Sequence, residues 1–545
     1  MLRPSLCALT LLLAAGACAP PADEPDAWLA RVDGLPFAAL QTGRDTADTI
    51  LEVNGGGLAL FDGDGDGDLD VLFVNPGPYP AGAAADTRSN KLYRNDGDWN
   101  FVDVTAESGV DLPGFFNGVA VGDVNSDGLR DLYLTRLGAN ALLLNGGDLR
   151  FELQTDALGA AGNSWSTSAV LRDMDLDGDP DLYVVNYLEF DPDAPPLHGE
   201  GGRHCMWKGH VVMCGPQNLP VQADRFYLNE GGHFVDASEA WGFEPAAHGY
   251  GLGVIDGDFD TDGRPDLYVT NDSTPNFLFL QREAGRVEER GLLHGAALSS
   301  QGREQAGMGL TAGDVEGDGD DDLFVTNFSM ESNALYTNDG AARFRERADA
   351  LGVGGPSKRL LGWGAAMFDL DLDGDLDLVH ANGHVYRQAS EPGTDTSYAQ
   401  ADTLWLNDGH GKFSEAAWPG DVAEVSRALA AGDLDDDGVL DLVVLQRAGA
   451  PRVYRGTTNA RSLQVRVVGP PGNPDGVGTR VLWRDAEGER SIQVRASAGY
   501  QAVGDPRPVF AWRGPGTLEW IAPDGSRHSR RVDDPGALSL PLEGE

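Results

Sequence analysis

Basic residues and cysteines are both scarce in this chain. Its 545 residues include 40 Lys and Arg against 86 Asp and Glu, a formal net charge of −46 at pH 7. A chain this acidic would be repelled by a polyanion, so non-specific nucleic-acid binding is excluded. The acidity has two interpretations, a solvated acidic surface or carboxylates gathered to bind cations. The positions of the acidic residues decide between them.

Long hydrophobic runs are also missing, and no segment has the roughly 20 apolar residues of a membrane-spanning helix. The apolar run Leu6–Ala15 is much shorter and follows a basic residue, as in an export signal. Ala15-Gly16-Ala17-Cys18 then resembles a bacterial lipobox, in which the cysteine is lipidated. We expect a signal peptide over residues 1–17, a lipid anchor at Cys18 and a tether over 18–34. The exported protein would be held at the outer membrane or cell surface by its lipid alone; an ordinary signal peptide, giving a secreted or periplasmic product, is the alternative.

The four cysteines fit the same compartment. Cys7 falls in the expected signal and Cys18 takes the lipid, which leaves Cys205 and Cys214. In an oxidising compartment, two cysteines this close indicate a disulfide. A zinc site that adds neighbouring histidines is the alternative, although the spacing fits no standard zinc pattern.

Seven copies of one acidic motif, D-x-[DNE]-x-D-G-x-x-D, are present, and a short apolar strand follows each. An oxygen-bearing side chain is kept at positions one, three, five and nine of every copy. These residues are Asp62, Asp64, Asp66 and Asp70; Asp123, Asn125, Asp127 and Asp131; Asp173, Asp175, Asp177 and Asp181; Asp258, Asp260, Asp262 and Asp266; Asp314, Glu316, Asp318 and Asp322; Asp369, Asp371, Asp373 and Asp377; and Asp433, Asp435, Asp437 and Asp441.

This spacing suits calcium, which takes six to eight oxygen ligands at about 2.3–2.6 Å. Position six is always glycine, as a sharp turn with positive φ requires. An EF-hand would place a Glu at position twelve and flank the loop with helices, whereas here a strand follows. A solvated acidic turn could explain one copy but not seven in register. The motif therefore predicts about seven calcium ions.

Around each motif the sequence shows the rest of a four-stranded unit. A small-residue strand such as Gly118–Val121 precedes the loop, and an apolar strand such as Leu132–Leu134 follows it. A third strand comes next, and then a fourth that Phe opens, as at Phe151. Four strands in each repeat of about 50 to 65 residues indicate the blades of a β-propeller. We expect an all-β fold with seven blades over residues 35–457.

The seventh unit lacks a Phe-led strand, and the N-terminal segment Phe37–Thr42 resembles the missing piece. We therefore expect an N-terminal strand to close the last blade and remove its open edge. The third and fourth motifs are 85 residues apart, and the excess lies in an insertion over 189–218 that contains the cysteine pair. Such a loop on a rigid scaffold is either a binding element or structural padding.

These residues resemble a known family. The motif-bearing blades resemble the FG-GAP/VCBS repeats of α-integrin-type propellers. In the C-terminal region, expected to be a small β domain over 460–545, Leu463–Val467, Asn473–Gly478 and Gly499–Gln501 resemble the ASPIC/UnbV domain. The combination is similar to the bacterial relatives of cartilage acidic protein 1. The resemblance implies secretion and calcium binding but no defined reaction, and the segment Phe510–Gly514 departs from the family's F-G-L-G pattern.

Catalytic signatures are missing from the sequence. It holds no G-x-S-x-G and no Gly-rich phosphate loop followed by Lys. Aromatic residues near the starts of inner strands and in the insertion could contact a ligand, namely Trp165, Trp207, Tyr250 and Trp363; packing of the channel is the alternative. We expect a binding or adhesion-type module for a protein or glycan partner. The alternative is a secreted enzyme that acts on polysaccharide as a lyase or dehydratase.

Overall fold

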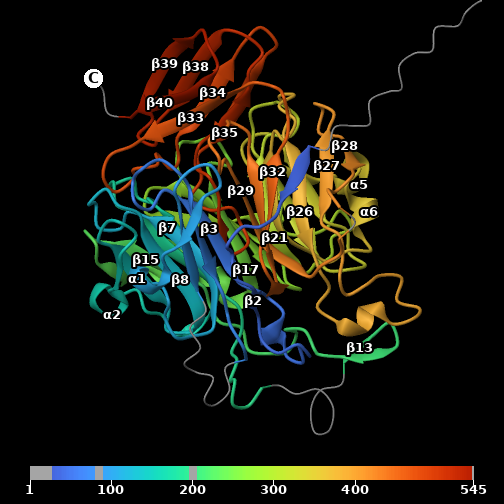
Figure 1. The fold of residues 1–545 in the computed structure, drawn as a ribbon. Coiled ribbons are helices and arrows are strands. Elements are labelled where there is room, and N and C mark those ends of the chain that lie inside the picture. The colour runs from blue at the N-terminus through green and yellow to red at the C-terminus, as the bar shows by residue number, and fades with distance from the viewer. Residues whose placement is uncertain (1–27, 80–89, 196–204, 421, 543–545) are drawn as a thin grey trace, which may run out of the picture.

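The computed structural model describes residues 28–79, 90–195, 205–420 and 422–542, and it is built almost entirely from β-strands (Figure 1). The expected signal peptide and the lipid-anchor residue Cys18 lie outside these residues. Seven four-stranded antiparallel units come first and a separate pair of small sheets follows. In the described part of the chain, no helix is long and apolar enough to cross a membrane.

The strands of each unit follow one another in the chain, with one exception in blade seven. They are β3 (Gly57–Phe61), β4 (Asp70–Val74), β5 (Lys91–Asn95) and β6 (Phe101–Asp103) in blade one; β7 (Phe116–Gly122), β8 (Asp131–Gly138), β9 (Ala141–Asn145) and β10 (Phe151–Leu153) in blade two; β11 (Ser164–Arg172), β12 (Asp181–Asn186), β15 (Arg225–Asn229) and β16 (Phe234–Asp236) in blade three; β17 (Gly251–Gly257), β18 (Asp266–Asn271), β19 (Phe277–Glu283) and β20 (Arg286–Glu289) in blade four; β21 (Gly307–Gly313), β22 (Asp322–Asn327), β23 (Ala334–Asn338) and β24 (Phe344–Glu346) in blade five; β25 (Gly362–Phe368), β26 (Asp377–Asn382), β27 (Thr403–Asn407) and β28 (Phe413–Ala416) in blade six; and β29 (Ser426–Gly432), β30 (Asp441–Gln446), β32 (Arg452–Gly456) and β1 (Leu29–Val32) in blade seven.

Helices are short, and the α-helices connect the blades. They are α1 (Thr105–Ser108), α2 (Thr155–Leu158), α3 (Ser238–Trp241), α4 (Gly291–His294), α5 (Ala348–Leu351) and α6 (Gly354–Ser357), with the 3-10 turns η1 (Ile50–Glu52), η3 (Glu244–His248) and η4 (Arg387–Ser390). The first five each end at a glycine with positive φ, such as Gly109 at 83°. A Cβ on Gly109 would lie 2.4 Å from the carbonyl oxygen of Phe151 in the next blade, so these glycines allow neighbouring blades to pack closely.

The first strands of the blades form a closed ring. Each of β3, β7, β11, β17, β21, β25 and β29 contacts the next one, and β29 contacts β3 again. Buried apolar side chains fill the space between successive blades, as Tyr183, Phe226 and Phe279 do between blades three and four. The predicted seven-bladed propeller is therefore the fold of residues 29–456.

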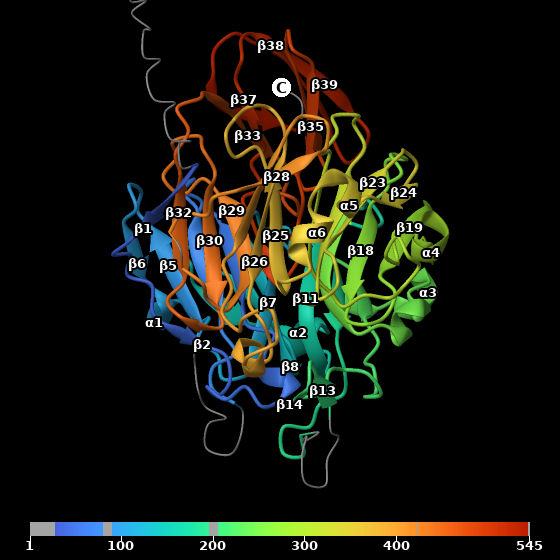
Figure 2. The same cartoon turned by 90° about the vertical axis from the view of Figure 1, so that its right-hand side faces the viewer.

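The closing strand comes from the N-terminus, as predicted, but the predicted residues are wrong. β1 (Leu29–Val32), from the stretch assigned to the tether, pairs antiparallel with β32 (Figure 2). The predicted segment Phe37–Thr42 contributes only the two-residue strand β2 (Leu40–Gln41), which pairs with β31 (Ala448–Gly449) between β30 and β32 of the same blade. The ring of Phe37 instead packs 4.8 Å from the ring of Tyr93, in the core shared by blades one and seven. In β1, Leu29 stands opposite Gly456, where five other blades place Phe opposite Asn. The pattern that marks the other outer strands is therefore missing from β1.

The C-terminal domain consists of two small sheets that lie over one end of the propeller (Figure 1). Its strands are β33 (Ser462–Val468), β34 (Arg480–Arg484), β35 (Glu489–Gln493), β36 (Ala502–Val503), β37 (Val509–Ala511), β38 (Gly516–Ile521), β39 (Arg527–Val532) and β40 (Gly536–Pro541). One strand leaves the domain: β36 pairs in parallel with β3 of blade one. The segment around β36 therefore enters the propeller.

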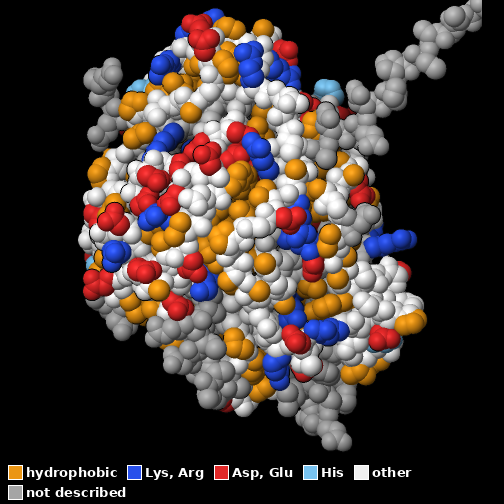
Figure 3. Space-filling model, viewed as in Figure 1, with side chains coloured by type: hydrophobic (Ala, Val, Ile, Leu, Met, Phe, Trp, Pro, Cys, Tyr) orange, Lys and Arg blue, Asp and Glu red, His pale blue; other side chains and the backbone are white. Residues whose placement is uncertain are grey.

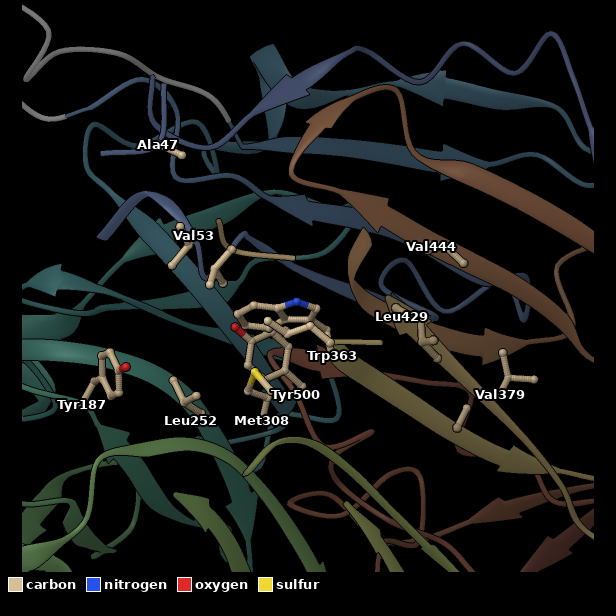
Figure 4. Close-up of a cluster of buried hydrophobic side chains, with 14 of the residues drawn as sticks. Ala47, Val53, Tyr187, Leu252, Met308, Trp363, Val379, Leu429, Val444 and Tyr500 are labelled. Atoms are coloured by element: carbon tan, nitrogen blue, oxygen red, sulfur yellow. The ribbon is translucent and has the colours of Figure 1, made fainter. Parts of the chain in front are cut away.

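Side chains from three sources fill the central channel. Tyr500, next to β36, is fully buried, and its hydroxyl donates a 2.7 Å hydrogen bond to the carbonyl of Asn54. Its ring lies 5.3 Å from that of Trp363 of blade six (Figure 4). From the opposite end, η1 contributes Leu51, and blade three contributes Trp165. The channel is thus a packed core.

The insertion forms a hairpin at the end of the propeller opposite the C-terminal domain (Figures 1 and 2). Its strands are β13 (Cys205–Trp207) and β14 (His210–Val212), and the predicted Cys205–Cys214 disulfide is present. Trp207 faces inward and packs 4.7 Å from the ring of His384. Met206 and Val211, paired across the strands, face outward and are 60% and 47% exposed.

Candidate metal centres in the blade loops

The seven acidic motifs form loops at one end of the propeller, each joining the first strand of a blade to the second. We number the loops by blade: 62–70, 123–131, 173–181, 258–266, 314–322, 369–377 and 433–441. Loop six, for example, leaves β25 at Phe368 and enters β26 at Asp377. Acidic side chains accordingly gather where the C-terminal domain meets the propeller (Figure 3).

Two positions of each loop have left-handed backbone. The glycine at position six has a φ between 83° and 105° in all seven loops, as predicted from the sequence. Position four is left-handed as well, and in five loops it is not glycine; Leu176 and Thr261, for instance, have φ values of 62° and 56°. Such residues are strained and persist only where the surroundings hold them. Sequence reasoning missed position four, although glycine at that position in loops one and five was a signal.

The aspartate at position one organises the turn. In loop six, Asp369 accepts the backbone N–H of Asp373 on Oδ1 and that of Gly374 on Oδ2, both at 2.9 Å. The same two bonds recur in loops two, three, four, five and seven. The backbone itself therefore holds this carboxylate in place within the loop.

The aspartate at position nine is buried beneath the loop. Asp377 accepts the N–H of Asn407 on Oδ1 at 2.9 Å and that of Leu370 on Oδ2 at 3.1 Å. Burial raises the pKa of this carboxyl to about 8, although the two N–H donors act in the opposite direction. Burial likewise raises the pKa of Asp70, Asp181, Asp322 and Asp441 to about 8. A cation in the loop would favour the ionised form of these acids.

The carboxylates converge, and their chemistry fits a hard cation. In loops one, three, four, six and seven, oxygens of three aspartates lie within 4.8 Å of one another. Two buried oxygens of position-three residues, Asp260 Oδ1 and Asp435 Oδ1, have no hydrogen-bond partner within the described residues. The other oxygen of each is held by an arginine, Arg282 at 2.6 Å and Arg455 at 2.9 Å. Each aspartate is therefore fixed with one oxygen available to an ion.

Loops two and five place their position-three residues differently. Asn125 donates a 2.9 Å hydrogen bond to Asp127, and the Glu316 carboxylate pairs with Arg347 at 3.1 Å. Neither loop forms a compact cluster of three carboxylates in the described structure. These two substitutions were predicted to keep an oxygen ligand, and that remains a prediction for both.

A further set of residues, missed by sequence reasoning, links six of the seven loops to the next blade. Asn407, at the end of β27, donates to the carbonyl of Leu376 in its own loop and to that of Val315 in loop five. Equivalent bonds to the preceding loop come from Asn95, Asn145, Asn229, Gln281 and Asn338. The recurrence of Asn two to four residues before the glycine turn of five blades was the available signal.

The four aromatic residues predicted as ligand contacts are all interior in this structure. Trp165 and Trp363 are 0% and 2% exposed, and Trp207 and Tyr250 are 7% and 8% exposed. Trp165, Tyr250 and Trp363 belong to the channel core, whereas Trp207 anchors the hairpin. Their placement corresponds to the packing alternative. Packing apolar rings against one another in the channel removes their surface from water, which is favourable.

One buried pair has the composition of a nucleophile and its base. The Ser329 hydroxyl lies 2.9 Å from His384 Nε2. However, His384 Nδ1 accepts the N–H of Tyr386, so the ring proton is on Nε2 and donates to Ser329. Burial lowers the pKa of His384 to about 3 and that of His380 to about 4. With this tautomer His384 cannot take the serine proton, and the pair is structural.

Comparison with known proteins agrees with this architecture. A sequence model of the FG-GAP-like repeat matches residues 62–134, 123–184, 258–325 and 314–380. The propeller therefore contains FG-GAP-like repeats, which cover its first six acidic loops.

Among individual proteins, the chain is similar to Cartilage acidic protein 1. The mouse protein (Mus musculus) is 26% identical over 265 residues, which cover 46% of this chain and 38% of that protein. The human protein is 25% identical over 266 residues, which cover 46% and 37%. The chain thus spans well under half the length of these relatives.

Among solved structures, an Agrocybe aegerita lectin that recognises non-reducing terminal N-acetylglucosamine aligns over 65% of this chain and 81% of its own, with 15% identity and a TM-score of 0.39. The rhamnogalacturonan lyase YesW aligns over 91% and 92%, with 14% identity and a TM-score of 0.32. These scores are too low to assign a function.

Proposed function

We propose that the protein is an exported calcium-binding propeller scaffold that presents a surface to a protein or glycan partner. The observation that carries the calcium assignment is the arrangement of Asp260 and Asp435. The side chain of each is largely buried, with one oxygen held by an arginine and the other without a hydrogen-bond partner in the described structure. Buried carboxylate oxygens with no partner are costly, and a hard cation with oxygen ligands would satisfy them.

The residues that would hold the ions are those at positions one, three, five and nine of each loop. Calcium would join carboxylates that otherwise repel one another and would stiffen the ring, because six of the seven loops are bonded to the next blade by an Asn or Gln side chain, such as that of Asn407. The carboxylates used in this way would be unavailable as acids or bases. The scaffold would therefore act by binding.

The partner surface we favour is the hairpin end of the propeller. All seven loops lie under the C-terminal domain, whereas the opposite end displays Met206 and Val211 side by side on a disulfide-linked hairpin. Exposed apolar side chains on a rigid support are suited to a protein interface. The lipid anchor at Cys18 and the export signal remain part of the proposal.

Calcium titration calorimetry on the mature, chelator-treated chain tests the metal assignment. We expect about seven sites in the wild type and the loss of one in Asp371→Ala, which removes a position-three ligand of loop six. Asp375→Ala is the matched control, because the side chain at position seven is not among the expected ligands. A wild-type chain that binds no calcium would refute the proposal.

Partner capture, by glycan array and by protein pull-down, tests the surface. The double variant Met206→Ser/Val211→Ser should lose the captured partner and retain the calcium isotherm. Leu293→Ser is the matched control, since Leu293 is 71% exposed on α4. Equal loss of binding in both variants would argue against the hairpin.

A further inference from the structure

The C-terminal domain bonds directly to the metal loops. In three neighbouring loops it reaches Oδ2 of the position-one aspartate: Gln464 Nε2 donates to Asp433 at 2.8 Å, Arg466 Nη2 to Asp62 at 2.9 Å, and the N–H of Gly472 to Asp123 at 2.8 Å. Gln464 and Arg466 both come from β33. One strand and the turn after it therefore cross loops seven, one and two in order.

Other contacts from the domain avoid the expected ligands. Arg480 and Arg495 pair with Asp321, at position eight of loop five, at 3.0 and 2.8 Å. Arg490 Nε donates to the carbonyl of Gly374 in loop six, and Arg507 pairs with Asp436, at position four of loop seven. Among these arginines, Arg466 is the one that bonds to an expected ligand carboxylate.

Loop one also differs from the other six in how its turn is closed. Elsewhere, Oδ2 of the position-one aspartate accepts the N–H of the loop's own position-six glycine. In loop one the Arg466 guanidinium bonds to this oxygen, while Asp62 Oδ1 accepts the N–H of Gly65 at 2.8 Å. A Cβ on Gly67 would lie 3.5 Å from Arg466 Nη1, so the guanidinium sits beside the turn. A cationic group from another domain thus takes the place of a neutral N–H.

We infer that loop one is a conditional cation site whose affinity is set by Arg466, and that an ion in loop one competes with the C-terminal domain for Asp62. The inference rests on the proposed function. A guanidinium 2.9 Å from a ligand oxygen repels a divalent ion and uses a lone pair that the ion needs. Loop one therefore binds calcium more weakly than loop two, where the donor that the domain contributes to the position-one aspartate is the neutral N–H of Gly472. Because such a coupling is reciprocal, calcium in loop one weakens the binding of β33 to loop one by the same factor.

Arg466 is a positioning residue in this scheme, and its removal should strengthen one site alone. We would titrate the full mature chain with calcium by calorimetry and follow β33 by hydrogen exchange. Arg466→Met should raise the affinity of a single site about tenfold, as expected for removal of one nearby partly screened charge. Arg466→Lys, which keeps the charge, should give a much smaller gain. Arg484→Met is the matched control, because Arg484 is exposed and pairs within its own sheet with Glu489 and Glu519.

Hydrogen exchange supplies a second readout. In the wild type, saturating calcium should speed exchange in β33 relative to the ion-free protein, and in Arg466→Met that calcium effect should vanish. An isotherm of Arg466→Met that matches the wild type, or a shift of all sites together, would overturn the inference while leaving calcium binding intact. A wild type that binds no calcium would overturn both. If Arg466→Met does not fold, Arg466→Gln, which can keep a hydrogen bond without the charge, replaces it in both experiments. The same results are then expected, and the same results would overturn the inference.

Discussion

The side chain of Asn95 in blade one donates a 3.0 Å hydrogen bond to the main-chain carbonyl of Leu434 in blade seven, 339 positions away in the sequence. The same amide nitrogen donates to Leu69 at 3.2 Å, and the Asn95 N–H bonds to Asp70 at 3.0 Å. A single buried residue therefore joins the first and last loops. The corresponding position of blade seven is Gly456, and there Thr458 Oγ1 reaches Asp371 of loop six at 3.1 Å.

Replacement of Asn95 should destabilise the ring. In Asn95→Ala two buried carbonyls, of Leu69 and Leu434, lose their donor, and we expect a loss of roughly 2–4 kcal/mol in the free energy of unfolding. Urea denaturation of the calcium-loaded protein measures it. Asn100→Ala is the control, because Asn100 is exposed in the turn after β5. Equal stability of the two variants would show that the link between the loops contributes little.

Removal of calcium should lower stability in proportion to the number of filled loops. With dissociation constants of about 0.1–1 mM, millimolar calcium adds roughly 0.4–1.4 kcal/mol for each site. Over seven sites the sum is about 3–10 kcal/mol, comparable with the stability of a whole domain. Calorimetric melting with and without EGTA should show a large fall in Tm, with magnesium in place of calcium as the control. A Tm that EGTA leaves unchanged would contradict this expectation.

Deletion of β1 should cause aggregation. Without residues 28–33, the edge of β32 would be exposed, and an unpaired edge strand recruits other chains. Light scattering and size-exclusion chromatography of the shortened protein would detect this, with a deletion that ends at residue 27 as the control. A stable monomer after loss of Leu29–Val32 would mean that the strand is dispensable.

Loss of the disulfide should affect the hairpin and spare the propeller. Closing a loop of about ten residues is worth about 2.5–3 kcal/mol in the chain-entropy estimate. In Cys205→Ser/Cys214→Ser we therefore expect faster hydrogen exchange in β13 and β14 and weaker partner capture. The Tm of the main transition should stay unchanged, since the blades contain no part of this crosslink. A fall in that Tm would show that the hairpin supports the ring.

The fold was predictable from the sequence because each blade repeats the same local chemistry. Position six of every loop is glycine, the strands that follow are apolar, and the spacing has one interruption. The closing strand was misplaced because Phe37 satisfies the pattern of the outer strands, whereas Leu29 and Gly456 do not. A Phe at the start of an outer strand reflects the pairing of neighbouring strands within one blade. Phe37 instead fills a space between two blades that are distant in sequence.

The candidate site was predictable to a smaller extent. Ligand positions follow from spacing, but the contacts of Arg466, Gln464 and Gly472 with the loops do not. These contacts depend on how the C-terminal domain docks, and no repeat or motif encodes that orientation. The burial of Trp363 has a similar cause: Tyr500, which covers Trp363, belongs to a segment more than 100 residues away.

The parallel pairing of β36 with β3 determines when the protein can be completed. Leu58 pairs with Ala502, so the first blade is among the earliest parts made and among the last to be finished. At about 5–20 residues per second, roughly 20–90 s of synthesis separate the two strands. Contacts between such distant residues also form slowly. The contacts between β3 and β36 can therefore form only when synthesis of the chain is nearly complete.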